Sequence, residues 1–248
     1  MLIKTPAELA ALMEAGRVVS LTLKAMRAAV TPGITTKRLD EIGAEVMRAH
    51  GARSAPRLVY KFPGDNCISV NDEVVHGIPG KRVLREGDLV KLDVTVEKEG
   101  FMADACITAP VGRVSARAAA LAETAEQAFH AALREVRPGR RACDVGAAVE
   151  EAVEKRGFHV VRTLTGHGIG RTIHEEPTIP NWGDPEHRTW LEAGMVITLE
   201  PIICAGSGDS YQGDDGWTIL TADGSLAAHY EHTLVVQKGA PLLLTGAA

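Results

Sequence analysis

The chain repeats itself at an offset of about 106 residues, and this duplication constrains the fold more than any other feature of the sequence. Pro32-Gly33 is followed by Gly51, and Pro138-Gly139 is followed by Gly157 with the same spacing. Between these points apolar residues recur with helical spacing, and each stripe ends at its glycine, as a helix with a left-handed cap does. An internal repeat of this length indicates two units built on one supersecondary plan.

The second part of each repeat is strand-like. Leu84 and Gly87 lead to Asp93, and Leu191 and Gly194 lead to Glu200, with matching spacing at an offset of 107. Both stretches alternate apolar and polar residues, which is typical of half-buried strands. For either strand alone, a polar face turned to water is an equally good interpretation. The duplication favours a shared site, because it places one carboxylate at the equivalent point of both halves.

These patterns predict an α+β fold with two pseudo-symmetric halves, each with two helices packed on an antiparallel sheet. Thr5 and Ser115 are placed to cap the first helix of each half. No Ser-, Gly- or Pro-rich linker separates the halves. We therefore expect a single catalytic domain over residues 1–248, with pseudo-repeats of about 1–110 and 111–248, and with the polar sheet faces converging between them.

Charge and hydropathy exclude several classes of protein. The net charge is −5 and the isoelectric point is near 6.0, so no overall electrostatic attraction to nucleic acid or anionic membrane is expected. No apolar run reaches the roughly 18 residues that a membrane-spanning helix needs. Four widely spaced cysteines form no paired metal motif and are interpreted as reduced thiols. A soluble cytoplasmic protein with no membrane partner is the expectation.

Two aspartates flank a predicted hairpin. Asp93 and Asp104 lie on either side of residues 97–100, and a tight turn at Lys98-Glu99 with Gly100 at positive φ would place them directly opposite each other. Carboxylates this close repel one another, and a divalent cation removes the repulsion. The alternative is an exposed acidic pair on an edge hairpin.

Further candidate ligands lie in the second half. His167 is flanked by glycines, His174 follows seven residues later, and Glu231 lies inside a strand-like run. The candidate ligands as a set are Asp93, Asp104, His167, Glu200 and Glu231. Four carboxylates and one imidazole would balance two divalent cations, and this oxygen-rich set suits Mn, Fe, Co or dinuclear Zn better than structural zinc. Two such ions can form a hydrolytic centre.

At these residues the sequence closely resembles the type I methionine aminopeptidases, which have the pita-bread fold. The matching stretches, in order, are Val75-His76-Gly77-Ile78-Pro79, Leu92-Asp93-Val94-Thr95-Val96, Gly166 to Gly170, His174-Glu175-Glu176-Pro177, Leu199-Glu200-Pro201, Asp215-Gly216-Trp217-Thr218 and Tyr230-Glu231-His232-Thr233. The resemblance runs from the first helix to about Gln237. It implies a curved sheet that surrounds a central dinuclear metal site, in agreement with the repeat.

The resemblance also implies roles for individual residues. The five candidate ligands would hold two divalent ions, Co, Mn, Fe(II) or Zn, with Asp104 and Glu231 bridging them. His76 would contact the amide nitrogen side of the scissile bond, and His174 would bind the carbonyl oxygen and the developing oxyanion. Glu200 would act as the proton shuttle for the attacking water, which would attack as a hydroxide that bridges the two ions.

A methionine pocket is implied as well. The matching positions are Phe62, Cys67, His76, Ile173, Ile202 and Trp217, although each could equally be a core residue. The implied reaction is hydrolytic removal of the initiator methionine from nascent proteins and peptides, with a preference for a small second residue. The implied partners are nascent polypeptides and, transiently, the ribosome. We expect a monomer without direct nucleic-acid recognition.

Two other functions remain as alternatives. An aminopeptidase P or prolidase shares the fold and ligands, but usually carries a large N-terminal domain and an Arg-rich approach to the last glutamate. A non-catalytic binding protein of the same fold would have lost ligands, whereas all five are present in this chain. One further hypothesis concerns Cys106, which shares strand parity with Asp104 and would make the site sensitive to oxidation.

Overall fold

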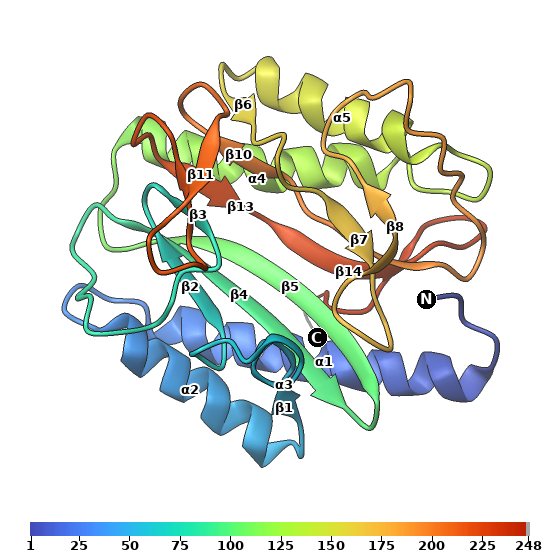
Figure 1. The fold of residues 1–248 in the computed structure, drawn as a ribbon, viewed down its shortest axis with the longest axis horizontal. Coiled ribbons are helices and arrows are strands. Elements are labelled where there is room, and N and C mark those ends of the chain that lie inside the picture. Colours follow the sequence, from blue (N-terminus) through green and yellow to red (C-terminus); the bar gives the residue numbers. More distant parts are fainter. Residues whose placement is uncertain (247–248) are drawn as a thin grey trace.

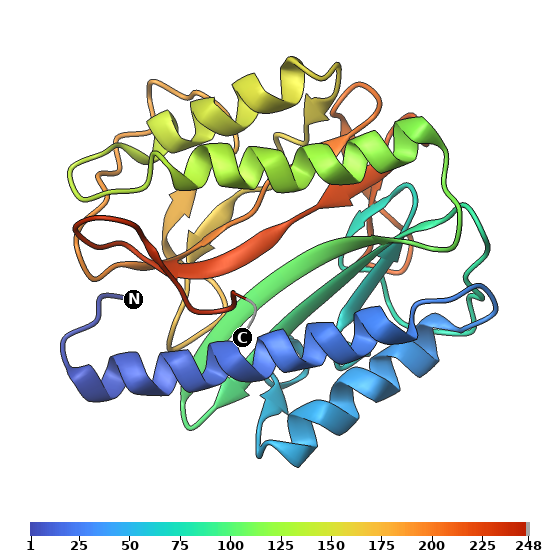
Figure 2. The same cartoon turned by 180° about the vertical axis from the view of Figure 1, so that it is seen from behind.

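The computed structural model describes residues 1–246 and has two pairs of helices outside a curved antiparallel sheet (Figure 1). Helices α1 (Pro6–Ala29) and α2 (Thr36–Ala49) cover the first half, and α4 (Ala116–Leu133) and α5 (Ala142–Glu154) cover the second. The short α3 (Ala55–Tyr60) follows the first helix pair in the chain. Seen from behind, α1 and α4 run along opposite sides of the strands that join the halves (Figure 2).

The strands form one large sheet and two small ones. In chain order they are β1 (Arg53–Ser54), β2 (Cys67–Val70), β3 (Glu73–Val75), β4 (Leu89–Lys98), β5 (Phe101–Pro110), β6 (His159–Val160), β7 (Gly166–Gly168), β8 (Glu175–Ile179), β9 (Val196–Leu199), β10 (Ile202–Cys204), β11 (Ser210–Gln212), β12 (Ile219–Thr221), β13 (Ala227–His229), β14 (Glu231–Val235) and β15 (Leu242–Leu243). The large sheet has the order β1-β4-β5-β14-β9-β7-β8, with β2 on β4 and β15 on β14. The small sheets are β13-β10-β6 and β11-β12-β3.

The predicted helix starts are confirmed. Thr5 accepts a hydrogen bond from the Glu8 backbone N–H and completes a capping box, and Ser115 accepts from the backbone N–H of Ala118. Each helix pair buries an apolar face against its own half of the sheet. The first core includes Val19, Met26, Leu39, Leu92 and Val94, and the second includes Leu121, Phe129, Val149, Leu199 and Ile203. Burial of these two faces brings the strand faces that carry the carboxylates toward each other.

The two sequence repeats have matching backbone geometry. The Gly33 backbone N–H donates to the Leu84 carbonyl over 2.8 Å, and Gly139 donates to Leu191 over the same distance. Both glycines have positive φ, 97° and 81°, which side chains rarely adopt. The bridge between residues 35 and 83 recurs between residues 141 and 190. The prediction of two pseudo-symmetric halves is therefore confirmed at the level of single hydrogen bonds.

The predicted register of the β4–β5 hairpin was wrong. The two-residue turn is Glu99-Gly100, with φ of 51° and 81°, and not Lys98-Glu99. Asp93 consequently lies opposite Cys106, and Asp104 lies opposite Thr95. The two aspartates still share a face, as diagonal neighbours, because the shift is an even number of residues. A two-residue hairpin turn of this type needs positive φ at both central residues, and the observed turn puts Gly100 at the second of them. Lys98 then stays in the strand, where it donates to the His50 carbonyl over 2.6 Å.

Strands β5 and β14 join the two halves. Their paired residues are Cys106 with Glu231 and Ala105 with His232. Beyond the second pair, a threonine hydroxyl bridges the strands. Thr233 Oγ1 accepts from the Asp104 backbone N–H over 2.9 Å and donates to the Asp104 carbonyl over 2.8 Å.

Each half also reaches across to the other. Leu2, ahead of α1, forms a β-bridge with Met195 in the second half. Leu244, after β15, packs on Gly16 of α1, where a Cβ atom would lie 2.2 Å from the Leu244 carbonyl oxygen. Only glycine permits that approach. Among the described residues, none of the helices combines the length and apolar character required to cross a membrane.

Candidate active site

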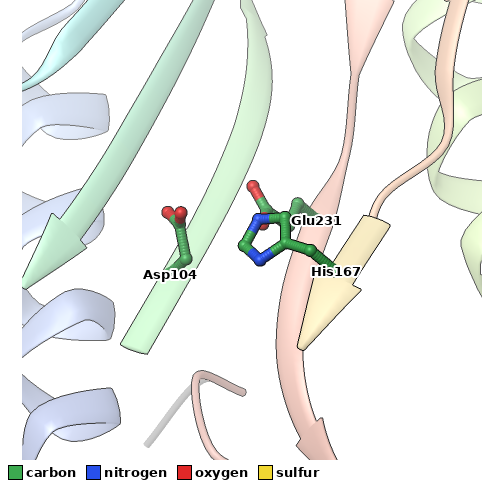
Figure 3. A group of neighbouring side chains, drawn as sticks. All are labelled: Asp104, His167 and Glu231. Atoms are coloured by element: carbon green, nitrogen blue, oxygen red, sulfur yellow. The ribbon is translucent and has the colours of Figure 1, made fainter. Parts of the chain in front are cut away.

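The five predicted ligands meet where the two halves join. Asp93 comes from β4, Asp104 from β5, His167 from β7, Glu231 from β14, and Glu200 follows β9 directly. All five line one cavity of about 80 Å³. Figure 3 shows Asp104 on one side of the junction, facing His167 and Glu231 on the other. The structure therefore brings together every residue of the predicted ligand set.

The environment of this cluster disfavours the charged form of its carboxyl groups. Burial raises the pKa of Asp104 to about 6. Burial, followed by the charge of neighbouring carboxylates, raises the pKa of Asp93 and Glu231 well above the usual value, and burial also raises that of Glu200. The repulsion predicted between Asp93 and Asp104 is therefore present. A divalent cation would relieve it by stabilising the charged forms.

The donor atoms fit such a cation. Within the described chain, Asp104 Oδ1 and Glu231 Oε1 are buried without a hydrogen-bond partner. Atoms of Asp104, His167 and Glu231 lie within 4.8 Å of one another, close enough to share one ion. The Nε2 atom of His167 is 3.4 Å from Glu200 Oε1, longer than a hydrogen bond. Buried oxygens and an imidazole nitrogen without partners are what a metal site requires.

Thr198, which the sequence analysis did not single out, orients two of these ligands. Its hydroxyl donates to Glu200 Oε1 over 2.6 Å and accepts from the His167 backbone N–H over 2.9 Å. The His167 Nδ1 atom lies 2.9 Å from the Gly168 carbonyl, so Nδ1 carries the proton and Nε2 keeps a free lone pair toward the cavity. Strand alternation, which puts Thr198 and Glu200 on one face, was the available signal.

Two further histidines border the cavity. Burial, and then the charge of His174, lowers the pKa of His76 to about 4, so its imidazole is neutral at pH 7. Packing around the ring also lowers the pKa of His174, which stands at the exposed mouth. The Tyr60 hydroxyl lies 2.7 Å from His174 Nδ1. Tyr60 was missed by the sequence analysis, because an aromatic residue at a helix end gives no signal of its distant partner.

An apolar pocket of about 240 Å³ adjoins the ligand cluster. The predicted pocket residues that line it are Phe62, Cys67, His76, Ile173 and Trp217, together with Asp93 and Asp104. The Phe62 and Trp217 rings meet edge to face at 5.2 Å. Ile202 does not line this pocket. It lies instead in the wall of the smaller ligand cavity, because β10 runs behind the carboxylates.

The structure argues against oxidation at Cys106. Its side chain is fully buried, and burial, followed by the charges of Asp93 and Glu231, raises the pKa of the thiol. The thiolate is the form that reacts with oxidants, so this cysteine is held in its unreactive state. Cys106 shares a face with Asp104, as strand parity predicted, and the sensitivity of the site to oxidation stays a hypothesis that this burial weakens.

His229 is a residue of this cavity that the sequence analysis missed. It is buried, and its Nε2 atom lies 3.5 Å from Glu231 Oε2 and 3.7 Å from Glu200 Oε2. Neither ring nitrogen has a hydrogen-bond partner within residues 1–246. Parity with Glu231, two residues later, was a weak signal. Its neighbour Glu200 is remote in sequence and could not be inferred.

Comparisons with known proteins place these residues in a family. The sequence model of metallopeptidase family M24 matches residues 10–238. Methionine aminopeptidase 2 of Bacillus subtilis (strain 168) is 43% identical over 247 residues, which cover 99% of both chains. The crystal structure of a methionine aminopeptidase from Thermotoga maritima has a TM-score of 0.95 at 36% identity and covers 99% of both chains.

A prolidase structure is a more distant neighbour. Prolidase from Pyrococcus furiosus has a TM-score of 0.79 at 22% identity, with 100% of this chain but only 66% of that chain covered. At this identity the likeness concerns the fold alone. The set of neighbours confirms the predicted pita-bread architecture, in which a curved sheet surrounds a cluster of metal-ligating residues.

Proposed function

The chain belongs to metallopeptidase family M24, and from that premise we propose that it is a methionine aminopeptidase. It releases the N-terminal methionine from peptides and proteins by hydrolysis, with a preference for a small second residue. The observation that carries this proposal is the apolar pocket of about 240 Å³ that opens directly onto the carboxylate cluster. A methionine side chain in that pocket would set its own peptide bond beside the ligands.

Two divalent ions, Co, Mn, Fe(II) or Zn, would be held by Asp93, Asp104, His167, Glu200 and Glu231, which line one cavity. When bound, the ions would supply Lewis-acid activation of water and of the scissile carbonyl. The protein contributes position: Thr198 fixes Glu200 and His167, and Thr233 fixes the backbone of Asp104. Buried carboxylates on rigid strands give the site little freedom to rearrange.

The remaining roles follow from the protonation states. Glu200 lines the ligand cavity and its carboxylate is fixed by the Thr198 hydroxyl, a position from which it can take a proton from water and return it to the leaving amine. His76 is neutral and half-buried beside the pocket, where it can hydrogen-bond the amide side of the scissile bond. His174 faces the carbonyl oxygen, and the Tyr60 hydroxyl holds its ring.

The shape of the pocket mouth favours flexible peptide N-termini as substrates. A pocket whose mouth is open and bordered by exposed Tyr60 and His174 accepts an extended N-terminus rather than a folded surface. We propose nascent polypeptides as the physiological substrates, with a transient ribosome association, a cytoplasmic location and a monomeric state. The whole of residues 1–248 would act as one catalytic domain.

The test uses chelator-stripped protein and a Met-Ala-Ser peptide. Methionine release should be absent without metal and should return with Co, Mn or Fe(II). An Ala-Pro peptide should remain uncut under the same conditions, which separates this activity from the prolidase-like alternative. Absence of methionine release with every metal, in protein that still binds the ions, would overturn the proposal in favour of a binding role.

A further inference from the structure

The junction between the halves contains a second threonine clamp. Thr108 Oγ1 accepts from the His229 backbone N–H over 2.9 Å and donates to the His229 carbonyl over 2.8 Å. These bonds repeat, on the other side of the paired residues, the two that Thr233 makes with Asp104. Strands β5 and β14 are antiparallel, so a local two-fold axis relates one clamp to the other.

That axis makes His229 the counterpart of Asp104. It likewise relates Cys106 to Glu231, the residues paired across the junction. Residues related in this way point their side chains to the same face of the sheet. His229 therefore stands at the position that mirrors a proposed metal ligand, and it lines the same cavity of about 80 Å³.

The distances at His229 are those of two ligands that share an ion. Metal bonds of about 2.0–2.2 Å at angles of about 90–120° place ligand atoms roughly 2.8–3.8 Å apart. His229 Nε2 is 3.5 Å from Glu231 Oε2 and 3.7 Å from Glu200 Oε2, beyond hydrogen-bonding distance. Donor atoms of these three residues all lie within 4.8 Å of one another.

We propose that His229 is a sixth protein ligand of the metal centre, binding through Nε2 the ion held by Glu200 and Glu231. This inference rests on the metal centre of the proposed function. It gives that centre a second imidazole besides His167. A second nitrogen makes the site more selective for Co, Fe or Zn over Mg or Ca than a single imidazole with carboxylates does.

The test counts imidazoles on Co(II). Each histidine bound to Co(II) gives one solvent-exchangeable, hyperfine-shifted ring N–H resonance in the proton NMR spectrum. We expect two such resonances in the wild-type protein and one in His229→Gln. His232→Gln is the matched control, because His232, on β14, is buried as His229 is, but bonds to Thr245 and Tyr230 outside the cavity. It should retain both resonances.

Metal affinity supplies an independent readout. Titration of metal-free protein with Co(II) should give an affinity about tenfold or more weaker in His229→Gln than in wild type. His229→Glu has an oxygen ligand of similar reach and should bind Co(II) more tightly than His229→Gln. If His229 only donated a hydrogen bond to the carboxylates, His229→Gln, whose side-chain amide also donates, would bind Co(II) as tightly as the wild type.

A single exchangeable resonance in the wild-type protein overturns the inference, and this result needs no variant to fold. Two resonances that both persist in His229→Gln, or a Co(II) affinity unchanged within twofold, also overturn it. Methionine release from a peptide is scored separately in the wild-type protein. If the wild-type protein releases methionine but shows a single imidazole resonance on Co(II), this inference alone is rejected. If it binds the metal but releases no methionine, the proposed function alone is rejected.

Discussion

Replacing Thr233 with valine should destabilise the protein through the junction between its halves. Thr233 is fully buried, and its hydroxyl both accepts from and donates to the Asp104 backbone. Valine keeps the shape but leaves the Asp104 N–H buried without a partner, which costs about 1–3 kcal/mol, and it removes a second hydrogen bond with a net value of about 0.5–1.5 kcal/mol. We expect a total loss of about 1.5–4.5 kcal/mol in the free energy of unfolding.

Urea unfolding of metal-free protein measures this loss directly. Thr178→Val is the control, because Thr178 lies exposed on β8 and should change the free energy of unfolding by less than about 0.5 kcal/mol. Thr233→Val should also bind Co(II) more weakly, since the strand that carries Asp104 is released. A variant as stable as Thr178→Val would refute the reasoning, because the two clamp bonds would then contribute nothing at the junction.

Three further predictions concern the hairpin and the pocket. Burial favours the neutral form of Glu97, but its bonds to Arg53 and to the Gly100 N–H outweigh burial and lower its pKa below 4.5. Glu97→Gln should therefore lower the free energy of unfolding by about 1 kcal/mol at pH 7, and by progressively less as the pH falls through the lowered pKa. Unfolding at pH 7 and at pH 3 measures this difference, and an equal loss at both values would contradict the prediction. Tyr60→Phe should lower kcat about tenfold with little change in KM, because His174 loses its orienting bond, and an unchanged kcat would remove Tyr60 from the site. Trp217→Ala should lower kcat/KM for Met-Ala-Ser several-fold at unchanged Co(II) affinity, and equal kcat/KM would show that the pocket is not where methionine binds.

The repeat and the convergence of the five candidate ligands could be predicted because both depend on local features. A glycine at positive φ, such as Gly33 or Gly139, marks its turn wherever it occurs, and strand alternation assigns a carboxylate to one face without knowledge of its partner. The register of Asp93 against Asp104 could not be predicted in the same way. A turn shifted by one residue moves the register by two and leaves every side chain on its original face, so alternation cannot distinguish the two choices.

Residues that act through remote partners were the ones missed. Tyr60 matters because His174 comes to lie beside it, 114 positions later in the chain. His229 and Thr198 matter because separate strands converge on Glu200. Such convergence is set by the packing of the two halves on each other, which no short stretch of sequence records.

The arms that cross between the halves make the protein a pair of interlocked units rather than two units in series. Leu2 pairs with the second half and Leu244 packs on the first. Leu244 also belongs to a buried cluster that contains Leu12 and Val196, so the two halves share part of their core. Unfolding should therefore occur in one cooperative transition. A single cut at Gly112-Arg113, the exposed connection between the halves, should leave both fragments associated and the metal ligands in place.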